Sequence, residues 1–136
     1  MVTIGKNKET WTTEALAEYE KRLKPYCTIE WILAKNDVQL EEFLTREGKF
    51  IALDPQGKAF SSEKFAHWLS EAAIQYNSRL TFAIGGAEGL PASVKRKASF
   101  LWSLSPLTFT HQLTRIILLE QIYRAFEIQR GSQYHK

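Results

Sequence analysis

Short apolar runs alternate with amphipathic stretches along the whole chain, and this alternation limits the possible folds more than any other feature. The runs at 2–5, 28–33, 50–53, 80–84 and 100–104 are rich in the β-branched and aromatic residues typical of strands. Helical signals fall at 12–22, 37–48, 62–76, 91–99 and 110–129. This order favours an α/β domain with a mostly parallel sheet flanked by helices. At 136 residues, we expect one domain over residues 1–136.

Local signals set the expected bounds of these elements. Thr12 or Thr13 can cap the first helix, and Asp37 can cap the second. The sequence Asp-Pro-Gln-Gly at 54–57 has the chemistry of a turn. The clearest helix is 62–76, because apolar side chains recur there at helical spacing, namely Phe65, Trp68, Leu69, Ala72, Ala73 and Tyr76.

The composition is that of a globular protein with a mildly basic surface. Hydrophobic residues make up 44% of the chain and charged residues 24%, and the net charge is +3 with an isoelectric point near 9.0. This balance permits a phosphate-bearing partner without requiring one. No run approaches the roughly 18 apolar residues that span a bilayer, and early charges argue against a signal peptide. With the single Cys27 and no metal-ligand spacing, we expect a cytoplasmic protein that uses neither membrane nor metal.

The expected last helix is too apolar to have only one buried face. Its apolar residues cover much more than a 100° stripe, and only Glu120, Arg124 and Glu127 form a narrow polar line. Such a helix is buried from several sides. Either it is the central helix of one chain, or one face packs against a second subunit. The pattern favours the second explanation, a homodimer.

A glycine corner at 84–91 follows an expected strand and precedes an expected helix. Gly85, Gly86 and Gly89 would let backbone N–H groups approach a ligand, and a helix N-terminus favours negative charge. The spacing fits neither a Rossmann fingerprint nor a Walker loop, and Glu88 would repel a triphosphate. Taken alone, the corner is more simply a tight structural turn than a ligand site.

Two further segments could carry function. The loop 104–110 follows a strand, a position where α/β folds bind ligands, although it could simply lead into the last helix. His111, in the first turn of that helix, is more simply a partly buried histidine than a base or an RNA contact. The tail 130–136 suits phosphate contact and base stacking, although polar termini usually fray. No catalytic Ser-His-Asp set can be assembled.

Several motifs occur in a recognisable combination. They are Phe-Ala-Ile-Gly-Gly-Ala-Glu-Gly at 82–89, Trp-Ser-Leu-Ser-x-x-Thr-Phe-x-His at 102–111, Leu-Glu-Gln-Ile-Tyr-Arg-Ala-Phe at 119–126 and Tyr-His-Lys at 134–136. Supporting matches are Ile-Gly-Lys at 4–6, Glu-Tyr-x-Lys-Arg-Leu at 18–23 and Leu-Asp-x-x-Gly-Lys at 53–58. The combination resembles the ribosomal large-subunit methyltransferase H family, which belongs to the SPOUT class. The resemblance covers nearly the whole chain.

The resemblance implies methylation of N3 of a pseudouridine in helix 69 of 23S ribosomal RNA, with S-adenosylmethionine as methyl donor. It implies a homodimer that acts on assembled ribosomes, and a C-terminal trefoil knot that general topology rules disfavour. Matching positions predict a cofactor pocket of apolar walls and backbone groups, suited to an adenine and a sulfonium. Its residues would be Leu53, Gly85, Gly86, Leu104, Ser105, Pro106, Leu107, Thr108 and Phe109.

The catalytic residues that we expect from this resemblance lie mainly in the tail. Methyl transfer is an in-line displacement, so positioning should dominate catalysis. We expect Tyr134, His135 and Lys136 to reach the substrate, with His135 helping to remove or orient the N3 proton. Lys136 or Arg115 could stabilise the developing imide anion.

Two other functions stay open at this point. A SPOUT methyltransferase that acts on transfer RNA is disfavoured by the terminal Tyr-His-Lys, and a non-catalytic RNA-binding module is disfavoured by the joint presence of corner, loop and tail. The chain also departs from the family pattern. Fewer residues precede 4–6, the segment 33–50 is short enough to suggest a missing or reduced helix, and Thr110 replaces a common proline. The last change is mild, because threonine suits a helix N-cap.

Overall fold

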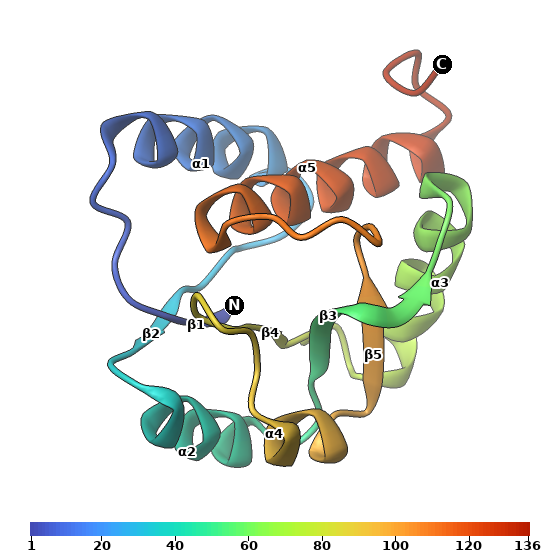
Figure 1. Cartoon of the computed structure of the whole chain (residues 1–136). Helices are drawn as coiled ribbons and strands as arrows, with labels where there is room; N and C mark the ends of the chain where they lie inside the picture. The colour runs from blue at the N-terminus through green and yellow to red at the C-terminus, as the bar shows by residue number, and fades with distance from the viewer.

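A five-stranded parallel sheet forms the centre of the protein (Figure 1). The computed structural model describes residues 1–136. The strand order is β2-β1-β4-β3-β5, and the strands are β1 (Val2–Ile4), β2 (Ile32–Ala34), β3 (Ile51–Ala59), β4 (Phe82–Ile84) and β5 (Phe100–Ser103). Every neighbouring pair is parallel, which confirms the expected α/β class.

Helices cover both faces of this sheet (Figure 1). They are α1 (Thr10–Leu23), α2 (Asp37–Glu47), α3 (Ser62–Gln75), α4 (Ala92–Lys97) and α5 (His111–Arg130). Helices α1, α3 and α5 share one core with the sheet, and α2 and α4 share another. Because α5 packs against both α1 and α3, it is the central helix of its layer. The homodimer and the trefoil knot stay predictions.

Alternate residues of the inner strands serve the two cores, as the pleat of a strand requires. In β4, Phe82 and Ile84 join the core of α1, α3 and α5, whereas Ala83 joins the core of α2 and α4. In β3, Ile51 and Ala52 divide in the same way. Strands covered on both faces read as continuous apolar runs, which is why these strands were visible in the sequence.

The starts of the helices follow the expected chemistry with small shifts. Asn36 rather than Asp37 caps α2, and its side-chain oxygen accepts the Gln39 N–H at 2.9 Å. The expected cap at Thr12 or Thr13 is wrong, because α1 starts after Glu9. Since α2 has 11 residues, a helix is present in the segment 33–50.

Strand β2 is shorter than expected, because it lies at the sheet edge and its one partner, β1, begins at Val2. The segment before it is held by other contacts. The indole N–H of Trp31 donates to a carboxylate oxygen of Glu20 at 2.5 Å, and the amino group of Met1 donates to the Glu30 carbonyl at 2.8 Å. Residues outside any strand therefore replace the first part of the predicted strand.

The expected turn at 54–57 is wrong, because β3 continues through it as a bulge. Leu53 and Lys58 both pair with Trp102, so the four residues between them bow out of the ladder. Gly57 makes this possible: a Cβ there would lie 2.7 Å from the carbonyl carbon of Leu101. The bulge places the segment 53–55 at the pocket described below.

Candidate active site

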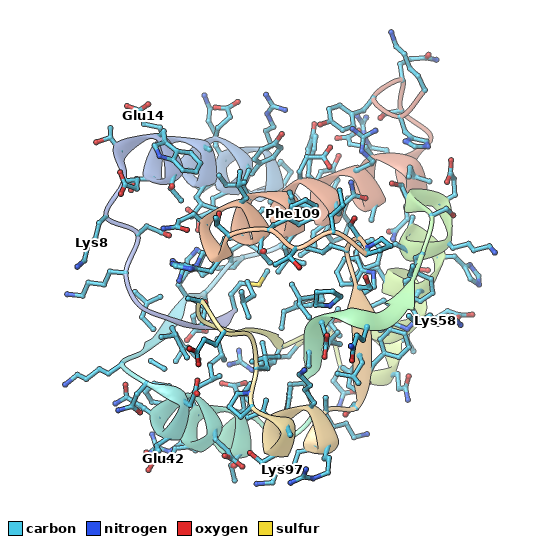
Figure 2. All side chains as sticks on the ribbon, in the orientation of Figure 1. Lys8, Glu14, Glu42, Lys58, Lys97 and Phe109 are labelled. Atoms are coloured by element: carbon cyan, nitrogen blue, oxygen red, sulfur yellow. The ribbon has the colours of Figure 1, made fainter.

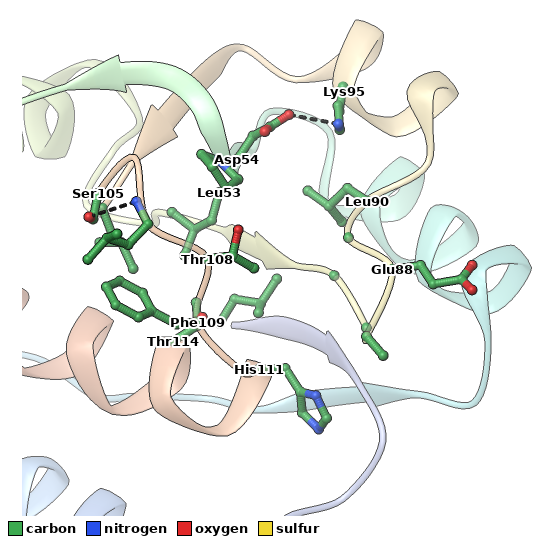
Figure 3. Close-up of a pocket in the computed structure, with 18 residues that line it drawn as sticks. Leu53, Asp54, Glu88, Leu90, Lys95, Ser105, Thr108, Phe109, His111 and Thr114 are labelled. Carbon is green, nitrogen blue, oxygen red and sulfur yellow. Dashed lines mark hydrogen bonds and ion pairs between the residues drawn. The ribbon is translucent and has the colours of Figure 1, made fainter.

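A pocket of about 330 Å³ lies between the bulge of β3, the carboxyl ends of β4 and β5, and the first turn of α5 (Figure 3). Parallel strands bring the segments that follow them to one edge of the sheet, where α/β folds bind ligands. Every predicted cofactor residue except Pro106 lines this pocket, namely Leu53, Gly85, Gly86, Leu104, Ser105, Leu107, Thr108 and Phe109. Their binding of a cofactor stays a prediction.

The glycine corner is built by close backbone contacts. A Cβ on Gly85 would lie 2.4 Å from the carbonyl carbon of Gly89, and Gly89 itself has a φ of +81°. The Gly89 N–H donates to the Gly86 carbonyl at 3.0 Å and closes the turn. A Cβ on Gly86 would meet only the Ile4 side chain, at an ordinary 3.7 Å. The corner is therefore a tight structural turn whose backbone also forms a wall of the pocket.

The loop after β5 is held by its own hydroxyl groups. Ser103 donates to the carbonyl of Ser105 at 2.9 Å. The Ser105 hydroxyl accepts the Leu107 N–H at 3.0 Å (Figure 3). The side chain of Thr110 accepts the Leu113 N–H at 3.3 Å, which confirms the expected helix cap. These bonds give the opposite wall of the pocket a defined shape.

His111 follows that cap and lines the pocket. Burial lowers the pKa of its imidazole, and the nearby charge of Arg115 lowers the pKa further. His111 is therefore neutral at pH 7, with one ring nitrogen free to accept a hydrogen bond.

Charged side chains meet in the pocket wall at the bulge. Lys95 of α4 contacts Asp54 with an N–O distance of 2.8 Å (Figure 3). Burial alone raises the pKa of Asp54, but hydrogen bonds from Lys95 and from the Gln56 N–H outweigh it and leave the pKa below its ordinary value. We did not predict either residue as a site residue. The signal for Asp54 was its place directly after the apolar run 50–53.

Arg115 does not reach the pocket. Its side chain is fully buried, and burial lowers the pKa of its guanidinium. The guanidinium points at the first strand and the segment after it, where it donates to the carbonyls of Ile4 at 2.7 Å and Gly5 at 3.1 Å, to the Thr3 hydroxyl at 3.2 Å and to the Asn7 side chain. In this position Arg115 ties α5 to β1, and its expected role in stabilising a substrate anion stays a prediction.

The C-terminal tail folds back on α5 and α3. The hydroxyl of Tyr134 donates to Glu120 at 3.1 Å, and burial together with this hydrogen bond raises the pKa of Tyr134 to about 12. His135 lies between Arg124, 3.0 Å from Nδ1, and Glu63, 2.7 Å from Nε2. The polar line predicted on the last helix thus serves to hold the tail.

The tail and the pocket of one chain are separate. Tyr134, His135 and Lys136 do not line the pocket. The last pocket residue on α5 is Thr114, and Arg124 follows ten positions later, which corresponds to about 15 Å of helix axis. In Figure 1 the C-terminus lies at the opposite end of α5 from the loop that enters it. One chain therefore brings the predicted cofactor residues together, but not the tail with them.

Metal and membrane sites are not indicated. No group of three or more His, Cys, Asp or Glu side chains could hold a metal ion. None of the helices combines the length and the apolar character that crossing a membrane requires. Charged side chains project outward from the ribbon in Figure 2, among them Lys8, Glu14, Glu42, Lys58 and Lys97.

A family model described as "Predicted SPOUT methyltransferase" matches residues 1–135. The chain is 53% identical to the Ribosomal RNA large subunit methyltransferase H of Protochlamydia amoebophila, over the whole chain and 96% of that protein. It is 43% identical to the protein of that name from Carboxydothermus hydrogenoformans and 41% identical to the one from Streptococcus sanguinis, in both cases over the whole chain and 98% of the relative. The parallel sheet, the pocket at its edge and these full-length matches agree, and the chain belongs to the ribosomal RNA large subunit methyltransferase H family of SPOUT methyltransferases.

Proposed function

We propose that the protein methylates N3 of a pseudouridine in helix 69 of 23S ribosomal RNA, in assembled ribosomes and with S-adenosylmethionine as methyl donor. The names of its relatives support large-subunit ribosomal RNA as the substrate class. The observation that carries the proposal is the pocket, in which the corner and the loop after β5 meet although they lie about 20 residues apart in the chain.

The chemistry of the pocket fits S-adenosylmethionine. Leu53, Ile84 and Leu90 supply apolar walls for an adenine, and the turn at 85–89 leaves backbone groups at the surface of the pocket. Two carboxylates, on Asp54 and Glu88, and one amine, on Lys95, line it. The excess of negative charge suits a ligand of net positive charge. When bound, S-adenosylmethionine supplies a methyl group activated by its sulfonium.

The residues of this chain have to position the base and accept the N3 proton, since N3 must lose that proton before or during methyl transfer. His135 helps to remove or orient that proton, and the ammonium of Lys136 stabilises the negative charge on the ring. Arg124 orients both aromatic groups of the tail: its guanidinium lies 4.8 Å from the centre of the Tyr134 ring and contacts His135.

The separation of tail and pocket supports a homodimer as the active form. A tail that is held about 15 Å of helix axis away from its own pocket can still meet the pocket of a second copy. The apolar surface of α5 offers a place for that copy: Leu113 is 41% exposed at the start of the helix.

The test is the transfer of a labelled methyl group to 70S ribosomes, separate subunits and transfer RNA in parallel, followed by mapping of the labelled nucleotide. We expect label in 70S ribosomes, at one position of helix 69. Label on transfer RNA alone would show that transfer RNA, and not ribosomal RNA, is the substrate. Binding of S-adenosylmethionine without transfer to any RNA would indicate that the tail does not act as proposed. Absence of S-adenosylmethionine binding would favour a non-catalytic RNA-binding module.

A further inference from the structure

The ion pair between Asp54 and Lys95 contributes to the net charge of the pocket, but neither residue has yet been given a contact with the ligand. Asp54 is only 7% exposed and is held from two sides, by the Lys95 ammonium at 2.8 Å and by the Gln56 N–H at 3.0 Å. The Lys95 side chain belongs to α4 and is 35% exposed. The carboxylate is therefore fixed in the fold, and it holds the ammonium at the edge of the pocket (Figure 3).

The Lys95 ammonium keeps binding capacity in this position. An ammonium group has three N–H donors, and Asp54 is the one carboxylate within ion-pair distance of it. Lys95 is also the one lysine or arginine among the residues that line the pocket, and His111 is neutral there. A ligand carboxylate that entered this pocket would find a single cationic side chain to bind.

We propose that Lys95, held in place by Asp54, binds the α-carboxylate of the methyl donor and so selects donors that carry an intact amino-acid end. The proposal rests on the proposed function, because it takes S-adenosylmethionine as the ligand. The α-carboxylate of that ligand can accept a charge-assisted hydrogen bond from the Lys95 ammonium. Asp54 is a positioning residue, because it acts on the ligand through Lys95.

Calorimetry with two ligands tests this assignment. S-adenosylmethionine and its decarboxylated analogue both carry the sulfonium and the adenine, and they differ in the carboxylate alone. Lys95→Met should weaken binding of S-adenosylmethionine by about tenfold to a hundredfold, the range for loss of a charge-assisted hydrogen bond. The same substitution should leave binding of the decarboxylated analogue unchanged or make it tighter. Lys95→Arg keeps the charge and should keep most of the affinity for S-adenosylmethionine.

Two further variants separate recognition from folding. Arg96→Met removes a positive charge from an exposed neighbour on α4 that does not line the pocket, and it should change neither affinity. The double variant Asp54→Asn with Lys95→Met removes both charges, so no unpaired carboxylate is left buried, and it should show the same selective loss. Equal weakening of both ligands by Lys95→Met would make the ion pair a purely structural contact and overturn the proposal, as would no weakening of either. If the unsubstituted protein binds neither ligand, the proposed function itself fails.

Discussion

Replacement of Arg115 by leucine should destabilise the protein strongly, although the residue lies outside the pocket. The guanidinium donates hydrogen bonds to two carbonyl groups, one hydroxyl and one side-chain amide, and of the residues that carry these acceptors Thr3 is buried while Ile4 and Asn7 are partly buried. A buried acceptor left without its donor costs about 1–3 kcal/mol, so the loss of these hydrogen bonds together should cost about 3–5 kcal/mol. We expect a loss of about this size in the free energy of unfolding.

Urea denaturation followed by tryptophan fluorescence measures this loss, with the slope of the transition as a check on two-state behaviour. Arg46→Leu is the matched control, since Arg46 is also helical but exposed, and it should change the free energy of unfolding by less than about 0.5 kcal/mol. At a temperature where Arg115→Leu remains folded, it should still bind S-adenosylmethionine. A variant of full stability that binds the donor but cannot transfer the methyl group would refute the structural role and restore the catalytic one.

Three further outcomes are expected. Gly85→Ala should unfold the corner and abolish donor binding, because its Cβ would lie 2.4 Å from backbone, whereas Gly86→Ala should fold normally; circular dichroism and calorimetry distinguish the two. Hydrogen bonds, the largest effect from Ser132, lower the pKa of Glu127 to about 2, so its stabilising effect is complete above its ordinary pKa and is lost as the pH falls from about 4.5 to 2. In thermal melts over that pH range, Glu127→Gln should reduce the fall in melting temperature on acidification. An unchanged fall would show that other carboxyl groups cause it. Deletion of 134–136 should abolish methyl transfer but spare donor binding, and full activity would exclude the tail from catalysis.

The parts of the fold that the sequence predicted are those set by local pattern. The strand at 50–53 was recognisable because burial on both faces leaves a continuous apolar run. The helix at 62–76 was recognisable because burial on one face leaves apolar residues at helical spacing. The bulge at 54–57 was not, because its cause is the distant Leu101 backbone, against which Gly57 packs. When the partner strand is unknown, a Pro and a Gly within four residues predict a turn as well as they predict a bulge.

The pocket shows the same division. Its corner and loop were predicted through the resemblance, since their motifs are contiguous in the sequence. Asp54 and Lys95 were missed because 41 positions separate them. They meet because β3, which carries Asp54, pairs with β4, and α4 with Lys95 follows β4 in the chain. The contact of Arg115 with the first strand was not predicted, because a charged residue in an apolar helix can be a functional group or a buried anchor, and the sequence does not show that Ile4 and Gly5 lie beside it.

The contact of Arg115 with β1 also affects how the chain folds during its synthesis. The first strand, β1, lies inside the sheet between β2 and β4. Its C-terminal end is hydrogen-bonded to Arg115 of α5, a helix that starts more than 100 residues later. Contacts of such sequence separation form late and slow folding. A nascent chain therefore carries an unfastened first strand until α5 has left the ribosomal exit tunnel. Products that end before α5 should be substrates for cellular proteases rather than stable fragments.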